Sequence, residues 1–431
     1  MMVHMASEDT RTTTATSIRT SETSEPRTPS TRAWTTRLLV LGIVLSALNL
    51  RPAITSLGAL LEEVRDGLGM SGTVAGVLTS VPPLCFAVFG VMAPRLARRF
   101  GPGAVVCAGM AAITAGLLLR PYAGSTAGFL AASALALMGI AVSNVLMPVI
   151  VKRWFPDRVG SMTGLYSMAL ALGTASAAAV TVPMTETLGG SWQTGLAVWA
   201  GLAAAAVLPW IPFVRRRGAG PAEPSAARRE HAREEAPLRI TRSRTAWALA
   251  VFFGLQATAA YITMGWMAQI FRDAGVPAST AGLLLAVTMV MGVPLAFVIP
   301  RVATRLPHQG PIVIALGVCG LAGYAGLYFA PAAGAWAWAL LLGVSNCAFP
   351  LALTMVGMRA RTGAGVAQLS AFAQSTGYLL SIPGPLLVGV LYQHSGGWGL
   401  PIALMTALMI PQMLVGVLAG RNRTVEDEAI R

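Results

Sequence analysis

A single arginine lies deep inside a long apolar segment near the start of the chain. If 37–60 is a helix rising 1.5 Å per residue, Arg51 lies about 21 Å along it. A guanidinium at that depth in hydrocarbon costs at least roughly 2.5 to 3.5 kcal/mol, so it should face a cavity. The competing interpretation is that the side chain extends to the interface, helped by a helix break at Pro52. Asn49 is a second polar residue of the same segment and favours the cavity.

Arg51 has no obvious acidic partner in the sequence. Every Asp and Glu lies in a tail, in a loop or at the end of an apolar segment, and the nearest are Glu62, Glu63, Asp66 and Glu186. An unpaired buried guanidinium favours an anion, or a planar group that accepts two parallel hydrogen bonds. The sequence therefore predicts that a small anionic or strongly acceptor-bearing solute docks on this side chain.

Other polar residues inside apolar segments could border the same cavity. Asn144 and Asn346 occupy equivalent places in the two halves of the chain, and the second half adds amides and aromatic side chains. With Arg51, the candidate binding residues are Asn49, Asn144, Gln256, Tyr261, Trp266, Gln374 and Tyr378. The alternative is that these groups only hydrogen-bond between helices, at about 0.6 to 2 kcal/mol each.

The residue types that build catalytic and metal sites do not gather anywhere in the sequence. The four histidines lie in tails, loops or a span end, and the four cysteines lie apart inside apolar segments. No phosphate-binding loop occurs. We therefore expect no cofactor, no metal and no enzyme activity, because an intramembrane enzyme would need a catalytic pair at depth. A membrane sensor stays open as an alternative function.

Composition indicates how these residues must be positioned. The chain has 431 residues, of which 55% are hydrophobic and 11% charged, whereas globular proteins carry about 25% charged residues. That excludes a soluble enzyme and predicts an all-α integral membrane protein with twelve spans. The expected spans are 37–60, 73–93, 102–120, 125–151, 159–182, 192–213, 245–271, 281–300, 311–330, 335–358, 366–391 and 399–419.

The net charge of +14 follows the topology and does not indicate nucleic acid. Of 31 Lys and Arg residues, 27 fall in the tails and the even-numbered loops. Only Arg65, Arg120 and Arg272 lie on the other side. Because positive loops stay in the cytoplasm, we expect a multi-pass protein of the cytoplasmic membrane with both termini cytoplasmic.

A charged stretch divides the chain into two blocks of nearly equal length. Equal blocks suggest a duplicated six-helix unit, and two such bundles with the substrate between them are the major facilitator plan. The expected parts are a disordered tail 1–36, a bundle 37–213, a linker 214–244, a pseudo-symmetric bundle 245–419 and a tail 420–431.

A basic cluster follows the second span. Arg95, Arg98 and Arg99 lie in Gly90–Gly101, which resembles the cytoplasmic gate loop of major facilitators. Pro94 stands where the usual pattern has an aspartate, so a charge relay through that acid is not expected. The arginines either interact with helix carboxyl ends or only set the topology.

Longer motifs resemble the cyanate permease and 2-nitroimidazole transporter family of the major facilitator superfamily. They are Asn49-Leu-Arg-Pro-Ala-Ile-Thr-Ser56, Asn144-Val-Leu-Met-Pro148, Val151-Lys-Arg-Trp-Phe-Pro156, Gly254-Leu-Gln256 with Tyr261 and Trp266, Phe349-Pro350-Leu-Ala-Leu with Arg359-Ala-Arg361-Thr, and Leu369-Ser-Ala-Phe-Ala-Gln-Ser375 with Gly377-Tyr378. The resemblance implies transport of a small polar or anionic compound, with polar positions at Arg51, Asn144, Gln256, Tyr261, Gln374 and Tyr378.

The expected function is secondary active transport by alternating access around a solute bound near Arg51. We expect a monomer whose partners are a small-molecule solute and the lipid bilayer. The solute, the direction and the energy source stay open. Proton coupling, exchange and passive facilitation are all compatible with the sequence, and Glu62 and Glu186 are weak candidates for a proton site.

Overall fold

The computed structural model describes residues 29–214 and 240–429. In these two ranges every regular element is a helix, and no strand occurs. Most of the expected tail 1–36 and linker 214–244 lies outside the described residues. The chain up to Arg37 forms a unit of its own, so the arrangement below concerns the chain from Leu38 onward.

The helices before the linker are packed as one group. They are α1 (Pro29–Asn49), α2 (Pro52–Ala59), α3 (Leu61–Leu68), α4 (Gly72–Phe100), α5 (Pro102–Leu119), η1 (Arg120–Tyr122), α6 (Thr126–Trp154), η2 (Pro156–Arg158), α7 (Val159–Thr187), α8 (Trp192–Ala197), α9 (Trp199–Val207), η3 (Leu208–Trp210) and α10 (Ile211–Val214).

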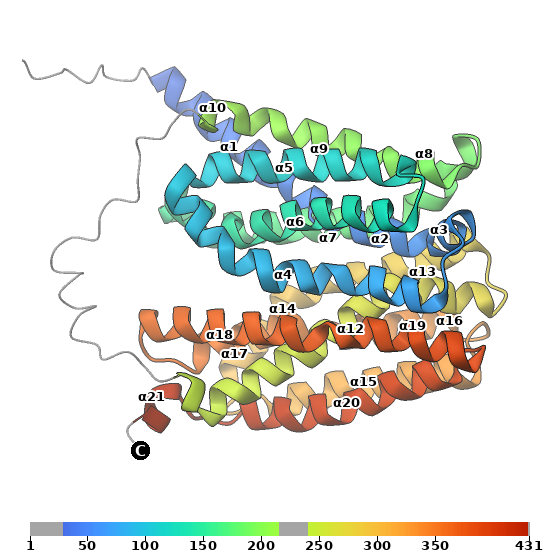
Figure 1. Ribbon diagram of the computed structural model, residues 1–431. Helices are drawn as coiled ribbons and strands as arrows, with labels where there is room; N and C mark the ends of the chain where they lie inside the picture. The colour runs from blue at the N-terminus through green and yellow to red at the C-terminus, as the bar shows by residue number, and fades with distance from the viewer. Residues whose placement is uncertain (1–28, 215–239, 430–431) are drawn as a thin grey trace, which may run out of the picture. The chain divides into compact units, whose positions relative to one another are not determined.

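The helices after the linker form the second group. They are η4 (Ile240–Arg242), α12 (Arg244–Asp273), α13 (Ala278–Val290), α14 (Gly292–Arg305), α15 (Gly310–Phe329), α16 (Ala335–Ser345), α17 (Ala348–Met358), α18 (Gly363–Ser381), α19 (Pro383–Ser395), α20 (Gly399–Ala419) and α21 (Val425–Ala429). We call the two groups the N-half and the C-half. Figure 1 shows them one above the other, with the N-half in blue to green.

Twelve helical segments of the described residues are long and apolar enough to cross a membrane. Each overlaps one of the predicted spans, so the predicted all-α membrane fold with twelve spans is confirmed. The largest differences are at the ends of the spans. For example, the helix predicted at 73–93 runs from Gly72 to Phe100, because its polar last turns continue the helix beyond the apolar stretch.

Several membrane-crossing segments are two helices joined by a short break. The first segment breaks at Leu50 and Arg51, directly before Pro52 starts α2. Proline has no backbone N–H to continue the ladder of the preceding turn, which explains the position of this break. Similar junctions occur at Met291 between α13 and α14, and at Asn346 between α16 and α17. At Met291 and Asn346 the backbone keeps helix-like φ and ψ although the helix is interrupted there.

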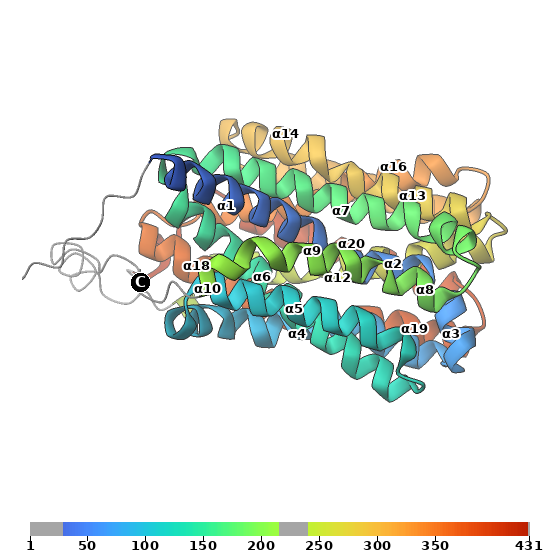
Figure 2. The same ribbon diagram turned by 90° about the horizontal axis from the view of Figure 1, so that it is seen from above.

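The two halves meet through very close backbone contacts at one end. We call this the α3 end, because α3 lies there, and we call the opposite end the α21 end (Figure 1). A Cβ atom on Gly58 would lie 2.0 Å from the carbonyl oxygen of Met264, and one on Gly389 would lie 2.4 Å from that of Gly72. Only glycine allows such an approach, so at this end the halves pack backbone against backbone. Along their length, α7 of the N-half packs beside α13 of the C-half (Figure 2).

The end of the chain is not a simple tail, as 420–431 was predicted to be. Val425 is buried, and its backbone N–H donates to the carbonyl oxygen of Arg359. Arg359 itself is buried and donates to the carbonyl oxygens of Ala419 and Gly420 and to the amide oxygen of Gln309. The predicted role of Arg359 was to set the topology, and the structure adds a packing role at the α21 end.

Helix α21 is also attached to the start of α12. The Glu428 carboxylate accepts hydrogen bonds from the Ser243 hydroxyl (2.6 Å), the Thr245 hydroxyl (2.9 Å) and the Thr245 N–H (3.1 Å). A carboxylate at a helix amino end is favoured by the helix dipole as well as by these bonds. The final segment therefore links elements within the C-half.

We predict that this attachment weakens in acid. Partial burial alone would raise the pKa of Glu428, but the hydrogen bonds from Ser243 and Thr245 outweigh it and lower the pKa. A lowered pKa means that the contribution to stability is present above the unfolded value of about 4.3 and is lost as pH falls through the folded value. The protection factors of the backbone amides of 425–429, which correct for the slower intrinsic exchange in acid, should then fall. Glu428→Gln should show the low protection already at pH 7, and Glu186→Gln at the α3 end should not.

Candidate functional site

A cavity of about 390 Å³ lies between the two halves. This volume is in the range of small-molecule sites, roughly 300 to 1,000 Å³. Its walls are mostly apolar and come from α7, α12, α13, α14, α16, α17 and α18, together with the break before α2. The lining residues are Arg51, Ser167, Leu170, Ala171, Thr174, Gln256, Ala257, Ala260, Tyr261, Met264, Thr288, Met289, Gly292, Ala296, Pro300, Gly343, Asn346, Cys347, Phe349, Pro350, Leu353, Thr354 and Tyr378.

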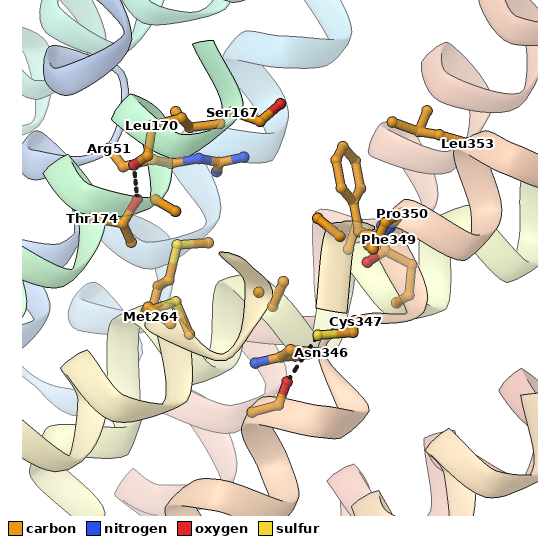
Figure 3. A pocket seen from close by; sticks show the side chains of 18 of the residues that line it. Arg51, Ser167, Leu170, Thr174, Met264, Asn346, Cys347, Phe349, Pro350 and Leu353 are labelled. Carbon is orange, nitrogen blue, oxygen red and sulfur yellow. Dashed lines mark hydrogen bonds between the residues drawn. The ribbon is translucent and has the colours of Figure 1, made fainter. Parts of the chain in front are cut away.

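The cavity runs from the helix breaks toward the α21 end. Helix α14 lines the cavity from Gly292 to Pro300, and α17 lines it as far as Thr354. Both helices run toward the α21 end. Figure 3 shows the side chain of Arg51 reaching into the space opposite Phe349 and Pro350. The cavity therefore has an N-half wall carrying a cation and a C-half wall carrying aromatic and amide groups.

Arg51 is the one charged residue among those that line the cavity. It forms the junction before α2, and Ile54 and Thr55 in the first turn of that helix donate backbone N–H groups to its carbonyl oxygen. Within the described residues no carboxylate forms an ion pair with it. The positive end of the α2 dipole lies at the same place, so the local field favours an anion.

Aromatic residues surround the guanidinium. Its central carbon lies 6.0 Å from the centre of the Phe86 ring. The Tyr261 hydroxyl lies within hydrogen-bonding reach of it, and Tyr166 and Tyr378 are near enough to interact with it electrostatically. The Tyr378 ring stacks on Phe86 with 5.1 Å between the ring centres. Neutral phenols can orient a guanidinium but cannot neutralise it, so the positive charge stays available to a solute.

Two amides at the cavity have unused hydrogen-bonding capacity. Gln256 is only 4% exposed, lines the cavity and has no hydrogen bond to any described residue. The Asn346 amide nitrogen is buried without a partner among those residues, whereas the Tyr261 hydroxyl lies within reach of the Arg51 guanidinium. Buried polar groups are rarely left unpaired, so the two amides fit partners supplied by a bound solute.

Half of the eight residues predicted to bind substrate line the cavity. These are Arg51, Gln256, Tyr261 and Tyr378. They come from the first, seventh and eleventh spans, so the structure brings together residues more than 300 positions apart in sequence.

The other four predicted residues do not line the cavity, because neighbouring groups satisfy them elsewhere. Asn49 donates to the carbonyl oxygens of Leu45 and Leu202. The Trp266 indole donates to the Thr79 hydroxyl.

Gln374 and Asn144 also have partners of their own. Gln374 donates to the Ser370 hydroxyl on its own helix. Asn144 accepts a hydrogen bond from Tyr166, which lies near Arg51.

The predicted gate loop is largely helical. Arg95, Arg98 and Arg99 lie in the last turns of α4, which continues through Pro94 to Phe100. All three are exposed, and none forms an ion pair within the described residues. Basic residues suit the negative carboxyl end of a helix, which is why the turn stays helical here.

Sequence reasoning missed the residues that complete the surroundings of Arg51. Phe86 and Tyr166 face the guanidinium, and Ser167 and Thr174 line the N-half wall. Asn346 was weighed as the counterpart of Asn144 but was not selected. The available signal for Tyr166 was a phenol in the middle of an apolar span, the same signal that selected Tyr261.

The α3 end of the molecule is closed by an ionic cluster between the halves. Arg272 of α12 forms ion pairs of 2.9 Å with both Glu62 and Glu63 of α3. Gln269 donates to Glu62 as well (3.3 Å). Asp273, next along the chain, accepts hydrogen bonds from Tyr392 and Trp398 of the C-half. Together with the glycine contacts, this cluster separates the cavity from the α3 end.

Comparison with known families explains this arrangement. A sequence model of the Major Facilitator Superfamily matches residues 39–382. The chain belongs to that superfamily.

Individual relatives support the same family assignment. The chain is 35% identical to the uncharacterized transporter YycB of Bacillus subtilis (strain 168), over 90% of this chain and 94% of that protein. It is 31% identical to the 2-nitroimidazole transporter of Escherichia coli (strain K12), over 90% of this chain and 96% of that protein. It is 28% identical to the cyanate transport protein CynX of the same organism, over 88% of this chain and 96% of that protein. The resemblance stated from the motifs is therefore confirmed.

Solved structures show the same fold. The inward open conformation of the xylose transporter XylE from E. coli covers 91% of this chain and 98% of its own, with a TM-score of 0.70 and 11% identity. This major facilitator is thus a multi-pass membrane protein and a secondary transporter of a small solute, not an enzyme. In alternating access, the state described here is closed at the α3 end, with its cavity extending toward the α21 end.

We predict that the Arg272 cluster sets the balance between this state and the one open at the α3 end. The Arg272 side chain is 15% exposed and its partners Glu62 and Glu63 are 40% and 33% exposed, so after solvent screening Arg272→Ala should favour opening by about 1 kcal/mol, roughly fivefold. Thr79→Cys in a background with the four native cysteines replaced reports on opening, because Thr79 is buried against Gly265. Its labelling by a membrane-impermeant maleimide should accelerate when Arg272 is removed.

Arg361→Ala is the matched control. It breaks an ion pair with Asp427 that lies within the C-half at the other end, so labelling at Thr79→Cys should not change. Equal labelling rates in the Arg272→Ala and parent backgrounds would show that the cluster does not hold the α3 end closed.

Proposed function

We propose that this carrier moves a small anion, or a small solute with strong planar hydrogen-bond acceptors, across the cytoplasmic membrane, and that Arg51 is its anchor. The main support is that a single uncompensated guanidinium faces a cavity between the halves. In a site of low dielectric constant such a cation attracts a negative or acceptor-rich partner strongly. The lining supplies no carboxylate that would compete with that partner.

The rest of the lining fits a small, flat solute. The Gln256 amide and the Asn346 amide nitrogen lie free at the cavity, and Tyr378 with Phe86 provides aromatic surface beside the cation. The relatives named for 2-nitroimidazole and for cyanate carry compounds of this description. Both are small and planar or linear, and both present strong acceptors.

The charge pattern supports a cytoplasmic position for the α21 end, and therefore for both termini. Arg65, Arg120 and Arg272 are the described arginines of the α3 end, whereas the loops of the other end carry clusters such as Arg95, Arg98 and Arg99. By the positive-inside rule the cavity then extends toward the cytoplasm, and the state described is inward-facing.

The same cavity limits how protons could take part. None of its lining residues is a carboxylate, so a proton that accompanies transport is carried by the solute itself or by the carboxylates of the α3 end, such as Glu62. One chain forms the entire cavity, which supports a monomeric carrier.

We predict that Arg51 determines anion transport. Removing a charge-assisted hydrogen bond costs about 1.5 to 3 kcal/mol, so Arg51→Gln should reduce kcat/KM roughly 10- to 150-fold. Arg51→Lys should restore only part of it, because an ammonium cannot form two parallel bonds. The measurement is uptake of radiolabelled cyanate and 2-nitroimidazole into proteoliposomes containing equal amounts of protein.

Arg98→Gln is the control, since it removes an exposed arginine far from the cavity. Transport by Arg51→Gln at the parent rate, with the control also unchanged, would contradict the proposed anchor. Absence of uptake of both probes by the parent would lead to a wider panel of monovalent anions before the function is rejected.

A second prediction concerns the facing wall. Gln256→Leu removes a hydrogen-bonding group of the C-half and should raise KM about 3- to 10-fold, equivalent to about 0.5 to 1.5 kcal/mol. Gln412→Leu is the matched control, because Gln412 is also a buried glutamine of the C-half but lies outside the cavity. Equal KM values for the two variants would exclude a direct contact between Gln256 and the solute.

A further inference from the structure

A second arginine is buried in the N-half, away from the substrate cavity. Arg120 ends α5 at the α3 end and is 2% exposed. Its guanidinium donates to the carbonyl oxygen of Ala53 (2.9 Å) and, at 3.5 Å, to the Ser56 hydroxyl. It also lies 5.9 Å from the centre of the Phe129 ring. Its Nε–H has no partner among the described residues.

Arg120 differs from the other arginines that the structure removes from solvent. Arg272 is paired with two carboxylates. Arg359 is as deeply buried as Arg120, but three oxygen atoms accept its hydrogen bonds. Arg51 faces a cavity that a solute can enter. Arg120 alone of these four has neither a carboxylate, nor a full set of acceptors, nor access to the substrate cavity.

A small cavity lies against Arg120. Its volume is about 20 Å³, enough for one particle about the size of a water molecule. The walls are otherwise mainly apolar, with Ile54, Leu57, Leu78 and Leu137 among them. Ser133 also lines it, and its buried hydroxyl has no hydrogen-bond partner among the described residues.

The polar groups around this cavity have unused hydrogen-bonding capacity beside a buried positive charge. The Arg120 Nε–H is free to donate, and the Ser133 hydroxyl is free to donate or to accept. Thr79, the third polar lining residue, already donates to carbonyl oxygens of its own helix and accepts from Trp266. A water molecule could accept from Arg120 and donate to Ser133, but it would leave the positive charge without a counter-charge. A monatomic anion accepts from both donors and also compensates the buried positive charge.

We propose that Arg120 and Ser133 form a binding site for a single halide-sized anion, separate from the substrate site at Arg51. The anion is the counter-charge that the protein does not supply. This inference does not depend on the identity of the transported solute.

The same structure indicates how the ion reaches its site. Gly58 and Thr79 line the small cavity and are also residues through which the N-half touches α12. When the halves separate at the α3 end, α12 no longer covers this wall, and the small cavity opens into the cleft between the halves. The ion therefore exchanges with the solution on the α3 side and is sealed in when that side closes.

The test measures halide-dependent stability of the full-length protein in detergent. Thermal unfolding is recorded at constant ionic strength while sodium gluconate is replaced by sodium bromide. The parent should show a saturable rise in Tm with bromide, since a ligand that binds only the folded state stabilises it by mass action. Crystals grown in bromide should show an anomalous peak between Arg120 and Ser133.

Two variants probe the site in different ways. Arg120→Gln removes the cation and should abolish the bromide-dependent rise in Tm. Ser133→Val keeps the cation but removes the second donor and fills space in the cavity, so it should abolish the rise even if Arg120→Gln does not fold. Arg51→Gln should keep the full rise while losing transport, which separates failure of this proposal from failure of the proposed function.

Three results would overturn the proposal. They are a parent Tm that does not depend on bromide, an equal bromide effect in the parent and in Ser133→Val, and crystals in which the cavity holds only a water molecule without anomalous signal.

Discussion

A guanidinium held in the middle of a membrane without a carboxylate partner constrains much of this protein. The charge needs a polar environment, and the break before α2 provides it by placing Arg51 at a cavity instead of on a lipid-facing helix surface. Phenols and an aromatic face around it hold the side chain in place without removing its charge. The cation lies on one half and most of the remaining lining on the other, so both halves form the walls of the cavity.

The membrane fold could be predicted from the sequence almost completely, because long apolar runs and the charges of the loops can be read directly along the chain. Each predicted span corresponds to a helical segment. The ends of the chain were less predictable. Arg359 was interpreted as a topogenic charge, yet it is buried, because its partners Gln309 and Ala419 are 50 and 60 residues distant in sequence. The ion pairs of Arg272 with Glu62 and Glu63 join the two halves, and they could not be predicted from the sequence either.

The candidate site was predictable only in part, for a related reason. A polar side chain in an apolar span has either a solute or a neighbouring helix as its partner, and composition does not separate these cases. Gln256 and Gln374 looked equivalent in the sequence, but Ser370 lies one turn before Gln374 and accepts its hydrogen bond. Asn144 and Asn346 lie at matching positions, but only Asn346 lines the cavity, because Asn144 accepts a hydrogen bond from the Tyr166 hydroxyl. The difference lies in the neighbours, which pattern analysis does not show.

The glycine contacts at the α3 end have a consequence for the energetics of rocking. Where Gly58 meets Met264 and Gly389 meets Gly72, no interlocking side chains must be pulled out of one another for the halves to part. Separation at this end also exposes a buried apolar cluster to which both halves contribute, with Leu57, Leu78, Trp266 and Phe271 among its residues, so parting the halves carries a hydrophobic cost. The glycines themselves add no side chain to that cost. A side chain added at one of these glycines would clash with the facing backbone and hold the halves apart, which offers a practical route to trapping the opposite state for structure determination.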